Sequence, residues 1–386
     1  MKNKLSVLIA SDSFKGSASS EEIARYISNG IQRVDETIQV SSLEIADGGE
    51  GTVQAITKAR SGQFHLKQVT GPMGKPVNAK YGIFGKRQAV IEVAETSGLT
   101  LVEPDELDPY KATSYGLGEL IKHLVNEGIQ DIYVGLGGSA CNDGGLGLLQ
   151  ALGGKVLDQA GNPASLGAAG LDQVHTINLD GVHELLQDVN IEVLSDVSNP
   201  LLGPSGATYI FGGQKGVMAE DFPIIDQYMS RFRDKVLKTL SIDLDKIPGA
   251  GAAGGLGATL GGLCGAKVHQ GIEKILQLID IESKVSQVDL VITGEGSMDI
   301  QSLYGKAPMG VATIAKNHNK PVIAIVGSVS DNISAIYQSE IDLIIDIINR
   351  PMSLEEAMDR TQILVENAGE NAIRSFLLSL HAKSHV

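Results

Sequence analysis

The chain has 386 residues, a formal charge of −15 and two cysteines, Cys141 and Cys264. This length favours two domains, the negative charge argues against a nucleic-acid partner, and two thiols make neither a disulfide framework nor a complete structural zinc site. No apolar run approaches the ~20 residues of a membrane span, and the short apolar start lacks a cleavage site, so we expect a cytoplasmic protein with no membrane partner.

The N-terminal region alternates strands and helices. The predicted order is strand, helix, strand, helix, at residues 5–11, 19–33, 39–45 and 50–58. Ser19 and Glu22 form a capping box at the start of the first helix. This alternation is typical of a parallel sheet with helices on its faces.

The middle of the chain differs from the two ends. Short alternating segments from about 64 to 95 predict antiparallel strands, and a helix at 112–126 and a strand at 131–136 follow. The C-terminal third returns to the first pattern, with predicted strands at 288–293, 322–326 and 341–347, a helix at 308–317, and one closing helix from about 353 to 380. The pattern leaves open whether the middle is an insertion.

Glycine-rich segments with acids, amides or lysines follow several predicted strands. In open α/β sheets, ligands bind beyond the carboxyl ends of the strands, so these segments are candidate binding loops. Each taken singly could also be an ordinary helix cap or Asx turn. The segments are 12–17, 46–52, 135–145, 195–201 and 289–299.

The candidate residues in these loops are of three chemical kinds. Lysines pair with phosphate or carboxylate, backbone amides beside glycines approach anions, and carboxylates suit a divalent cation or a substrate hydroxyl. The lysines are Lys15 and Lys306; the acids are Asp47, Glu50, Asp143, Asp196, Glu295 and Asp299; the anion-binding candidates are Ser13, Gly48, Gly49, Gly137, Gly138, Ser139, Asn142, Asn199 and Gly294.

Residues 249–257 formally match a dinucleotide-binding G-x-G-x-x-G pattern. The preceding Asp-Lys-Ile-Pro is not a credible strand, so the required context is missing. Small residues that allow close helix packing explain this segment better. The chain also lacks a complete P-loop, a G-x-S-x-G nucleophile motif and a protein-kinase H-R-D set.

Six segments in order give the chain a specific resemblance. They are Asp-Ser-Phe-Lys-Gly-Ser, Ala-Asp-Gly-Gly-Glu-Gly-Thr, Gly-Leu-Gly-Gly-Ser-Ala-x-Asn-Asp-Gly-Gly, Asp-Val-x-Asn-Pro-Leu, Gly-Ala-Gly-Ala-Ala-Gly-Gly and Thr-Gly-Glu-Gly-x-x-Asp. On these residues the chain resembles the bacterial glycerate kinase family. Cys141 stands where this family pattern leads us to expect Thr, which weakens any role for that side chain.

The resemblance implies ATP-dependent phosphorylation of D-glycerate with Mg²⁺ and leans to the 2-hydroxyl as acceptor. It also implies an α/β fold of two domains: a flavodoxin-like parallel-sheet domain formed by both chain ends (1–66 and 283–386) and a mixed-sheet α/β domain inserted at 67–282. The active site is expected in the cleft between the domains. Oligomeric state stays open, with a homodimer among the alternatives.

Phosphoryl transfer depends on positioning and charge neutralisation, which gives the candidates hypothetical roles. Lys15 and then Lys306 would bind the glycerate carboxylate or the transferred phosphoryl group. Asp47 or Asp196 would accept the proton of the attacking hydroxyl, and the sequence does not separate these two. Three further acids would serve the metal or its water shell, and glycine amides would run along the phosphates; the acids are Asp143, Glu295 and Asp299, and the glycines are Gly137, Gly138 and Gly294.

Two other classes of protein are alternatives to a kinase. A dinucleotide-dependent oxidoreductase would need an acid at a second strand end about 20 residues after 135–140, whereas Asp158 lies in a Gly/Pro-rich turn. A non-catalytic metabolite sensor on the same fold would not need so many acid- and glycine-rich segments. Both alternatives therefore explain fewer of these acid- and glycine-rich segments than a kinase does.

Overall fold

A computed structural model describes residues 4–299, 306–330, 334–337 and 340–383 of the chain. The chain divides into two compact units, which we call unit 1 (residues 1–46 and 272–386) and unit 2 (residues 47–271). The boundaries differ from the predicted ones at 66/67 and 282/283. Residue 66 lies in a strand of the unit 2 sheet, β3 (Gln63–Thr70), and residue 282 lies in a helix of unit 1, α12 (Ile281–Ser286).

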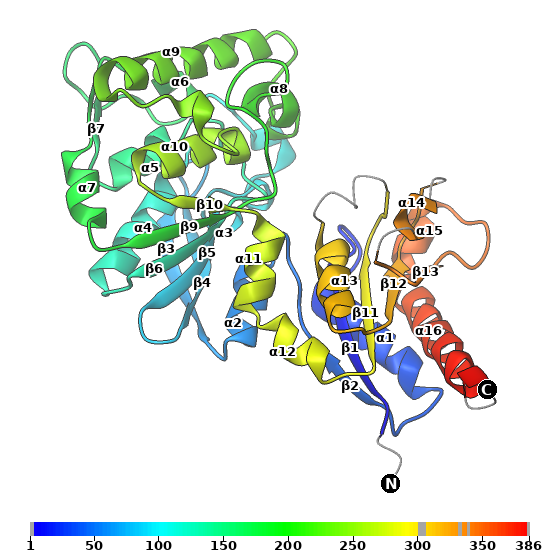
Figure 1. Cartoon of the computed structure of the whole chain (residues 1–386). Coiled ribbons are helices and arrows are strands. Elements are labelled where there is room, and N and C mark those ends of the chain that lie inside the picture. The colour runs from blue at the N-terminus through cyan, green and yellow to red at the C-terminus, as the bar shows by residue number, and fades with distance from the viewer. Residues whose placement is uncertain (1–3, 300–305, 331–333, 338–339, 384–386) are drawn as a thin grey trace. The chain divides into compact units, whose positions relative to one another are not determined.

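Unit 1 contains a five-stranded parallel sheet with the order β13-β12-β11-β1-β2 (Figure 1). Numbered along this unit alone, the order is 2-1-3-4-5, which is the flavodoxin-like order. Its central strands are buried along their length, as expected when helices cover both faces. The strands are β1 (Ser6–Ser11), β2 (Gln39–Ser42), β11 (Leu290–Glu295), β12 (Val322–Val326) and β13 (Leu343–Asp346).

Two of the helices predicted for unit 1, at 19–33 and 308–317, are present in the structure. The first, α1 (Ser20–Gln32), begins with the predicted capping box, in which Ser19 Oγ accepts from Glu22 N and the Glu22 carboxylate accepts from Ser19 N. It packs against the C-terminal helix, α16 (Thr361–Lys383). The other helices of unit 1 are α11 (Gly271–Leu278), α12, α13 (Ala307–Asn317), α14 (Ser334–Tyr337) and α15 (Leu354–Asp359).

The prediction of one continuous closing helix was wrong, because α15 and α16 are separate helices. Arg360 between them has φ −102° and ψ 11°, outside the helical region. The side chain of Thr361 donates to the Met358 carbonyl at 2.8 Å. A threonine that bonds to the preceding turn bends or interrupts a helix, and the apolar spacing gives no sign of such a break.

Unit 2 contains a six-stranded mixed sheet with the order β10-β9-β6-β5-β4-β3. Its first two strands, β3 and β4, run antiparallel as predicted, and the other four are parallel to one another. The parallel and mixed sheets together confirm the predicted α/β fold class. Besides β3, the strands are β4 (Pro76–Phe84), β5 (Gln88–Glu92), β6 (Asp131–Gly135), β9 (Asn190–Leu194) and β10 (Lys267–His269), and β7 (Lys155–Leu157) pairs with β8 (Thr176–Asn178) in a separate ribbon.

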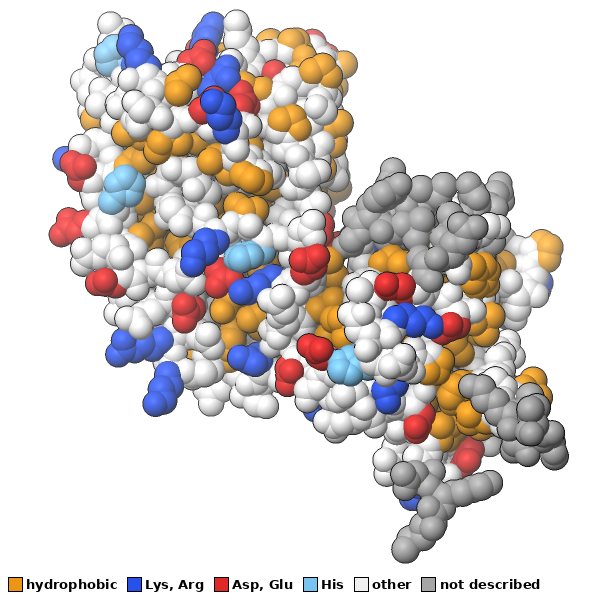
Figure 2. Space-filling model, in the orientation of Figure 1, with side chains coloured by type: hydrophobic (Ala, Val, Ile, Leu, Met, Phe, Trp, Pro, Cys, Tyr) orange, Lys and Arg blue, Asp and Glu red, His pale blue; other side chains and the backbone are white. Residues whose placement is uncertain are grey.

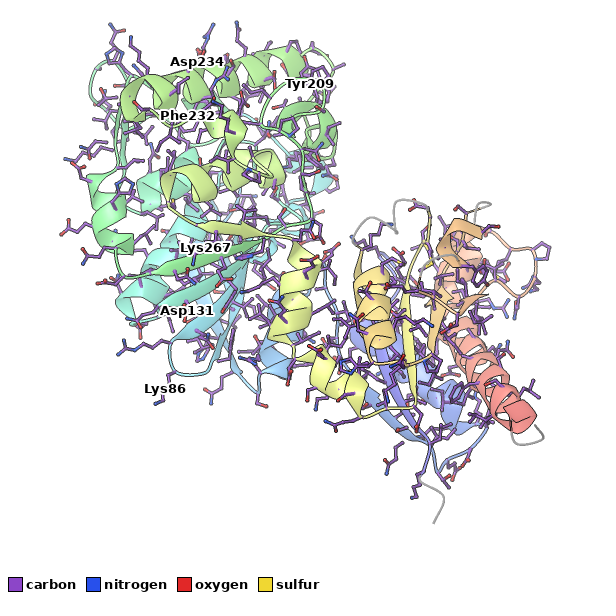
Figure 3. The ribbon with its side chains drawn as sticks, in the orientation of Figure 1. Lys86, Asp131, Tyr209, Phe232, Asp234 and Lys267 are labelled. Atoms are coloured by element: carbon purple, nitrogen blue, oxygen red, sulfur yellow. The ribbon has the colours of Figure 1, made fainter. Side chains whose placement is uncertain are left out.

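One large apolar core holds the helices of unit 2 against its sheet. The long helix α9 (Phe222–Leu240) carries a fully buried Phe232 on its inner side, whereas Asp234 lies on its exposed side (Figure 3). The remaining helices are α2 (Thr52–Ala59), α3 (Val93–Ser97), α4 (Tyr115–Asn126), α5 (Leu146–Ala151), α6 (Ala168–Leu171), α7 (Asp180–Leu186), α8 (Ala207–Phe211) and α10 (Leu256–Leu263).

The helices and the surface carry the features that bear on membrane and nucleic-acid binding. Across the described part of the chain, every helix is too short or too polar to cross a bilayer. On the face drawn in Figure 2, basic side chains are interspersed with acidic ones in both units. A mixed surface of this kind gives no basic footprint for nucleic acid on that face.

Candidate active site

The first group of predicted residues lies in unit 1, where β1 and β11 are neighbours. The chain leaves these two strands toward opposite edges of the sheet, and ligands bind at such a switch point in doubly wound folds. The loops beyond the two strands lie side by side: Asp12 N donates to the Gly294 carbonyl at 2.9 Å, and a Cβ on Gly296 would lie 3.3 Å from Phe14 Cα. The exposed side chain of Lys15 belongs to this loop pair.

Lys306 joins the same group from the position before α13. Its Nζ lies 3.3 Å from Glu295 Oε2 and 3.6 Å from Asp299 Oδ1. The side chains of Lys306 and Asp299 are 41% and 43% exposed, whereas Glu295 is buried, so ligands reach this ion cluster through Lys306 and Asp299. The structure therefore brings together one predicted cation and two of the three predicted metal-binding acids. The neighbouring Gly305 lies outside the described residues.

Two other predicted residues of unit 1 have more local roles. Gly294 is buried inside β11, in register with Ser11 and Ile325, and a Cβ there would lie 2.0 Å from the Ile325 carbonyl oxygen. Gly294 thus has a neighbouring strand on each side, and its lack of a side chain allows these strands to pack closely. This position does not favour the predicted contact of its amide with phosphate. Ser13 is half-buried, and its amide donates to Asp12 Oδ1 at 2.6 Å.

The second group lies in unit 2, at the carboxyl ends of β6 and β9. Gly137 N donates to the Gly48 carbonyl at 3.1 Å, so this predicted phosphate-binding amide already has a protein acceptor. Added Cβ atoms would lie 2.3 Å from Gly49 Cα at Gly137 and 2.6 Å from the Leu194 carbonyl oxygen at Gly48. Such approaches exclude any side chain, and Gly48 also has a left-handed φ of +91°. Three predicted loops, at 46–52, 135–145 and 195–201, thus meet at this end of the sheet.

The predicted acids of these loops remain accessible. Asp47 is half-buried, and its Oδ1 accepts from Gly49 N at 3.0 Å. Glu50 and Asp196 are exposed. Asn199 donates from Nδ2 to the Ser205 carbonyl at 2.9 Å and so stabilises its own loop, through a bond that spans six residues and is not an Asx turn. Gly138 is exposed with φ +73°.

Asp143 is placed differently from the other predicted metal ligands. Its carboxylate is fully buried and accepts from Ser114 N at 2.8 Å, from Ser114 Oγ at 2.9 Å, and from the amides of Gly145 and Gly147 at 3.1 and 3.3 Å. Burial raises the pKa of Asp143, and these donors counteract the rise. This arrangement fixes the glycine-rich loop and does not favour a metal ligand.

The described residues also contain no group of three or more His, Cys, Asp or Glu side chains placed to hold a metal ion. Asp143 belongs to unit 2, whereas Glu295 and Asp299 belong to unit 1. A Mg²⁺ ion often keeps several waters and uses one or two protein carboxylates. Glu295 and Asp299 are therefore sufficient in number and chemistry for such a site.

The polar side chains at 139–142 are buried, and one of them has a partner that the sequence analysis missed. Asn142 Nδ2 donates to Thr208 Oγ1 at 3.0 Å, and Ser139 Oγ accepts from Lys215 Nζ at 2.8 Å. Cys141 is also fully buried, and burial raises the pKa of its thiol, so it behaves as a small apolar side chain. The one clue to Lys215 was its place in a glycine-flanked run, Gly-Gly-Gln-Lys-Gly.

Glu92 is a second residue that the sequence analysis did not identify. It ends β5, is 2% exposed, and its carboxylate accepts from Val53 N at the start of α2. Burial raises its pKa to about 8. The residue thus fixes the end of the loop Gly48–Gly51 where α2 begins. An acid at the end of an apolar strand was the one feature of the sequence that could have pointed to Glu92.

Residues 249–257 agree with the packing interpretation and not with dinucleotide binding. A single-turn helix, Leu244–Lys246, precedes the segment in place of a strand. Gly144 N donates to the Gly254 carbonyl at 2.9 Å, and a Cβ on Gly254 would lie 2.2 Å from the Cys141 carbonyl oxygen. The segment therefore supports the loop 135–145 from behind.

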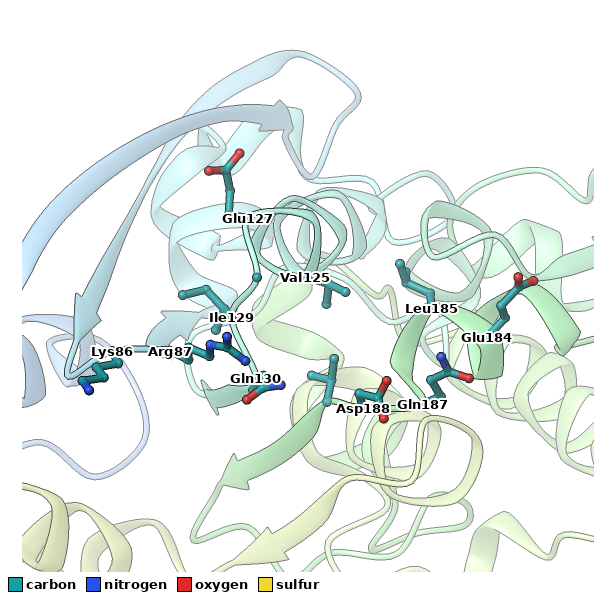
Figure 4. Close-up of a pocket in the computed structure, with 12 residues that line it drawn as sticks. Lys86, Arg87, Val125, Glu127, Ile129, Gln130, Glu184, Leu185, Gln187 and Asp188 are labelled. Atoms are coloured by element: carbon teal, nitrogen blue, oxygen red, sulfur yellow. The ribbon is translucent and has the colours of Figure 1, made fainter.

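A cavity of about 450 Å³ lies elsewhere in unit 2 (Figure 4). The lining comes from residues 86–87, 125, 127–130, 184–185 and 187–189, and these segments precede β5, β6 and β9. It therefore lies at the amino ends of the parallel strands, opposite to the candidate loops. Its lining mixes lysine and arginine with three acids, which gives no preference for an anionic or a cationic ligand.

The fold and these loops define a class of protein: a two-unit α/β protein whose glycine-rich strand ends carry lysines and carboxylates suited to small anionic ligands. A model of the glycerate kinase family matches residues 7–377. The chain is 43% identical to a glycerate kinase of Bacillus subtilis (97% of this chain, 98% of the relative) and 42% identical to a glycerate 2-kinase of Escherichia coli (92% and 93%). A crystal structure from Salmonella typhimurium LT2, whose protein is assigned as glycerate kinase 2, superposes with a TM-score of 0.82 at 40% identity, covering 97% of this chain and 99% of that one.

The chain therefore belongs to the glycerate kinase family. This confirms the resemblance found in the sequence and the predicted enzyme class, a kinase. The oxidoreductase and sensor alternatives find no support in the fold around 249–257 or in these relatives.

Proposed function

We propose that this enzyme transfers a phosphoryl group from ATP to the 2-hydroxyl of D-glycerate in a Mg²⁺-dependent reaction. The choice of the 2-hydroxyl is supported by the E. coli relative named glycerate 2-kinase. The observation that carries the proposal is the accessible ion cluster of Lys306, Glu295 and Asp299 at the β1/β11 switch point. Lysine and paired carboxylates at such a point suit a phosphate with its cation.

Each charged residue of unit 1 has a role in this proposal. Lys15 and Lys306 neutralise charge on the glycerate carboxylate or on the transferred phosphoryl group, which is the main task of a phosphotransferase. Glu295 and Asp299 hold Mg²⁺ through its waters or directly; when bound, the ion neutralises charge on the phosphates. Asp143 is not given a metal-binding role, since its oxygens already accept five hydrogen bonds inside unit 2.

The general base remains a choice between two residues of unit 2. Asp47 lies just before Gly48 and Gly49, and Gly49 packs on Gly137. Asp196 lies two residues after Leu194, whose carbonyl packs on Gly48. Both are accessible to a substrate hydroxyl. An Asp→Asn substitution at the true base should reduce kcat far more than the same change at the other residue. The predicted position of the site in a cleft between the domains stays a prediction.

The test is an assay of ADP release with D-glycerate, ATP and Mg²⁺, combined with phosphorus NMR of the product. Glycerate-dependent ADP release that stops on addition of EDTA, with 2-phosphoglycerate as product, is the expected result. Formation of 3-phosphoglycerate would overturn the choice of hydroxyl. Absence of turnover by verified folded protein would overturn the proposed activity as a whole.

A further inference from the structure

Lys215 is a buried lysine at the carboxyl-end side of the unit 2 sheet. It ends a single-turn helix, Gly213–Lys215, between α8 and α9, and only 2% of its surface is exposed. Its Nζ donates to Ser139 Oγ and to the Cys141 carbonyl, both at 2.8 Å. The ammonium group therefore lies directly behind the turn at 137–139, which carries the exposed Gly138.

This ammonium group has no ion-pair partner in contact among the described residues, and the negative charge of the buried Asp143, which acts on it from a greater distance, offsets only part of the cost of its burial. Within the described part of the chain, no carboxylate oxygen lies within 4.0 Å of Lys215 Nζ. Burial lowers the pKa of Lys215 to about 8. A buried cation without an ion-pair partner is costly, and an apolar side chain of similar size would be the more stable choice. The presence of a lysine at this position is therefore better explained by a function than by a contribution to stability.

Two further buried polar atoms lie around the same loop without a partner among the described residues. They are Ser97 Oγ and Asn142 Oδ1. Ser97 accepts from Ala140 N through its carbonyl at 2.8 Å, so it flanks the loop directly. Polar groups that are buried at a site and only partly paired mark a place where a ligand or water completes the hydrogen bonding.

We propose that Lys215 is a positioning residue of the phosphotransfer site, whose buried ammonium fixes Ser139 and supplies the positive charge that holds a substrate oxyanion at the 137–139 turn. This inference rests on the proposed function. The oxyanion is either a phosphate of the nucleotide or the carboxylate of glycerate, because both would be attracted by an amide-lined turn with a cation behind it. Because the Lys215 side chain is buried, it acts through its hydrogen bond to Ser139 and through the electrostatic potential of its positive charge.

The test compares Lys215→Met with Lys238→Met, which removes an exposed lysine from the last turn of α9 in the same unit. Steady-state kinetics would give kcat and the KM values for ATP and for D-glycerate, and thermal unfolding would give Tm with and without each substrate. We expect Lys215→Met to raise one of the two KM values at least about tenfold, the range of a lost charge-assisted hydrogen bond. The KM that rises identifies the oxyanion. Lys238→Met should leave all values unchanged.

A second variant keeps the proposal testable if Lys215→Met folds poorly. Ser139→Ala should raise the same KM by a smaller factor, and the double variant should show less than the product of the two effects, because both act through one contact. Unchanged KM values in the Lys215→Met and Ser139→Ala variants, with only a lower Tm, would overturn the proposal and leave Lys215 a structural residue.

Failure of the proposed function would be recognised separately. If the wild-type protein showed no turnover, the proposed function would be overturned, and the rise in Tm caused by ATP or by D-glycerate would still report binding. Loss of that rise in Lys215→Met, with Lys238→Met behaving as wild type, would support the role of Lys215. Retention of the full rise would overturn it.

Discussion

The loops at the strand ends of the two units look alike in sequence but use their charged residues differently. In unit 1, Lys15, Lys306 and Asp299 are exposed or half-exposed. In unit 2, Asp47, Glu50 and Asp196 are also accessible, but three further charged residues, Asp143, Lys215 and Glu92, are buried and bond to loop backbone or to a loop side chain. We therefore expect charges that a ligand can reach to contribute to binding, and buried charges to contribute by shaping the loop that binds.

This difference shows that a charged residue in a glycine-rich loop is not by itself a ligand-binding residue. Asp143 and Asp299 occur in similar contexts, yet only Asp299 has an accessible carboxylate. Substitutions in unit 1 should therefore affect catalysis with little loss of stability. Substitutions of the buried charges in unit 2 should affect stability as well.

The largest expected effect on catalysis is that of Lys15→Ala. Removing this exposed cation should reduce kcat/KM by about 10² or more, which corresponds to about 2.7 kcal/mol of transition-state stabilisation. Steady-state kinetics would measure it, with Lys4→Ala as the control, since Lys4 is exposed and precedes β1 at the opposite end of the same strand. Near-normal turnover in Lys15→Ala would remove Lys15 from the mechanism.

The second effect should appear in stability. Asp143→Asn removes the charge that accepts hydrogen bonds from Ser114, Gly145 and Gly147, and leaves buried donors poorly paired. We expect a loss of about 2 kcal/mol in the free energy of unfolding, measured with urea. Asp188→Asn, an exposed acid of unit 2, is the control. A stable Asp143→Asn protein with strongly weakened Mg²⁺ activation would restore Asp143 as a metal ligand.

A smaller catalytic effect is expected for Lys306→Ala. Lys306 is 41% exposed and shares its charge with Glu295 and Asp299, so its contribution is screened by solvent. We expect kcat/KM to fall about tenfold and the free energy of unfolding to change little, since exposed ion pairs contribute about 0–1 kcal/mol. A large loss of stability without loss of activity would place Lys306 among the structural residues instead.

The last prediction concerns the pH dependence of stability at Glu92. Its pKa is raised from 4.5 to about 8 in the folded protein, so the folded state holds a proton that the unfolded chain releases. This contribution to stability is fully present below about pH 4.5 and is lost as the pH rises through 8. Glu92→Gln should therefore lose less stability than wild type between pH 5 and 8, measured by urea unfolding. Parallel pH profiles for the two proteins would contradict this.

Much of the fold could be predicted from the sequence because its strands and helices carry strong local signals. The capping box at Ser19 and the buried strand Val322–Val326 are examples that the structure confirms. The break at Arg360 could not be predicted, since the apolar pattern continues across it and only a side-chain bond from Thr361 to Met358 accompanies it.

The candidate site was less predictable than the fold. Glycine and acid content located the loops, but it could not tell a reachable carboxylate such as Asp299 from a buried one such as Asp143. Lys215 was missed because its importance depends on contact with Ser139, 76 residues away in the chain. Burial and long-range contacts of this kind are properties of the folded structure and leave little trace in a single sequence.

We propose that the charge cluster of unit 1, which is reached through the half-exposed Lys306 and Asp299 and includes the buried Glu295, binds the nucleotide and its metal, whereas Asp143 holds a loop. A crystal structure with a non-hydrolysable ATP analogue, Mg²⁺ and D-glycerate tests it most directly. We predict Mg²⁺ coordinated, directly or through water, by Glu295 or Asp299, with Asp143 still bonded to Ser114. Coordination of Mg²⁺ by Asp143, with Glu295 and Asp299 away from the ion, would contradict the account.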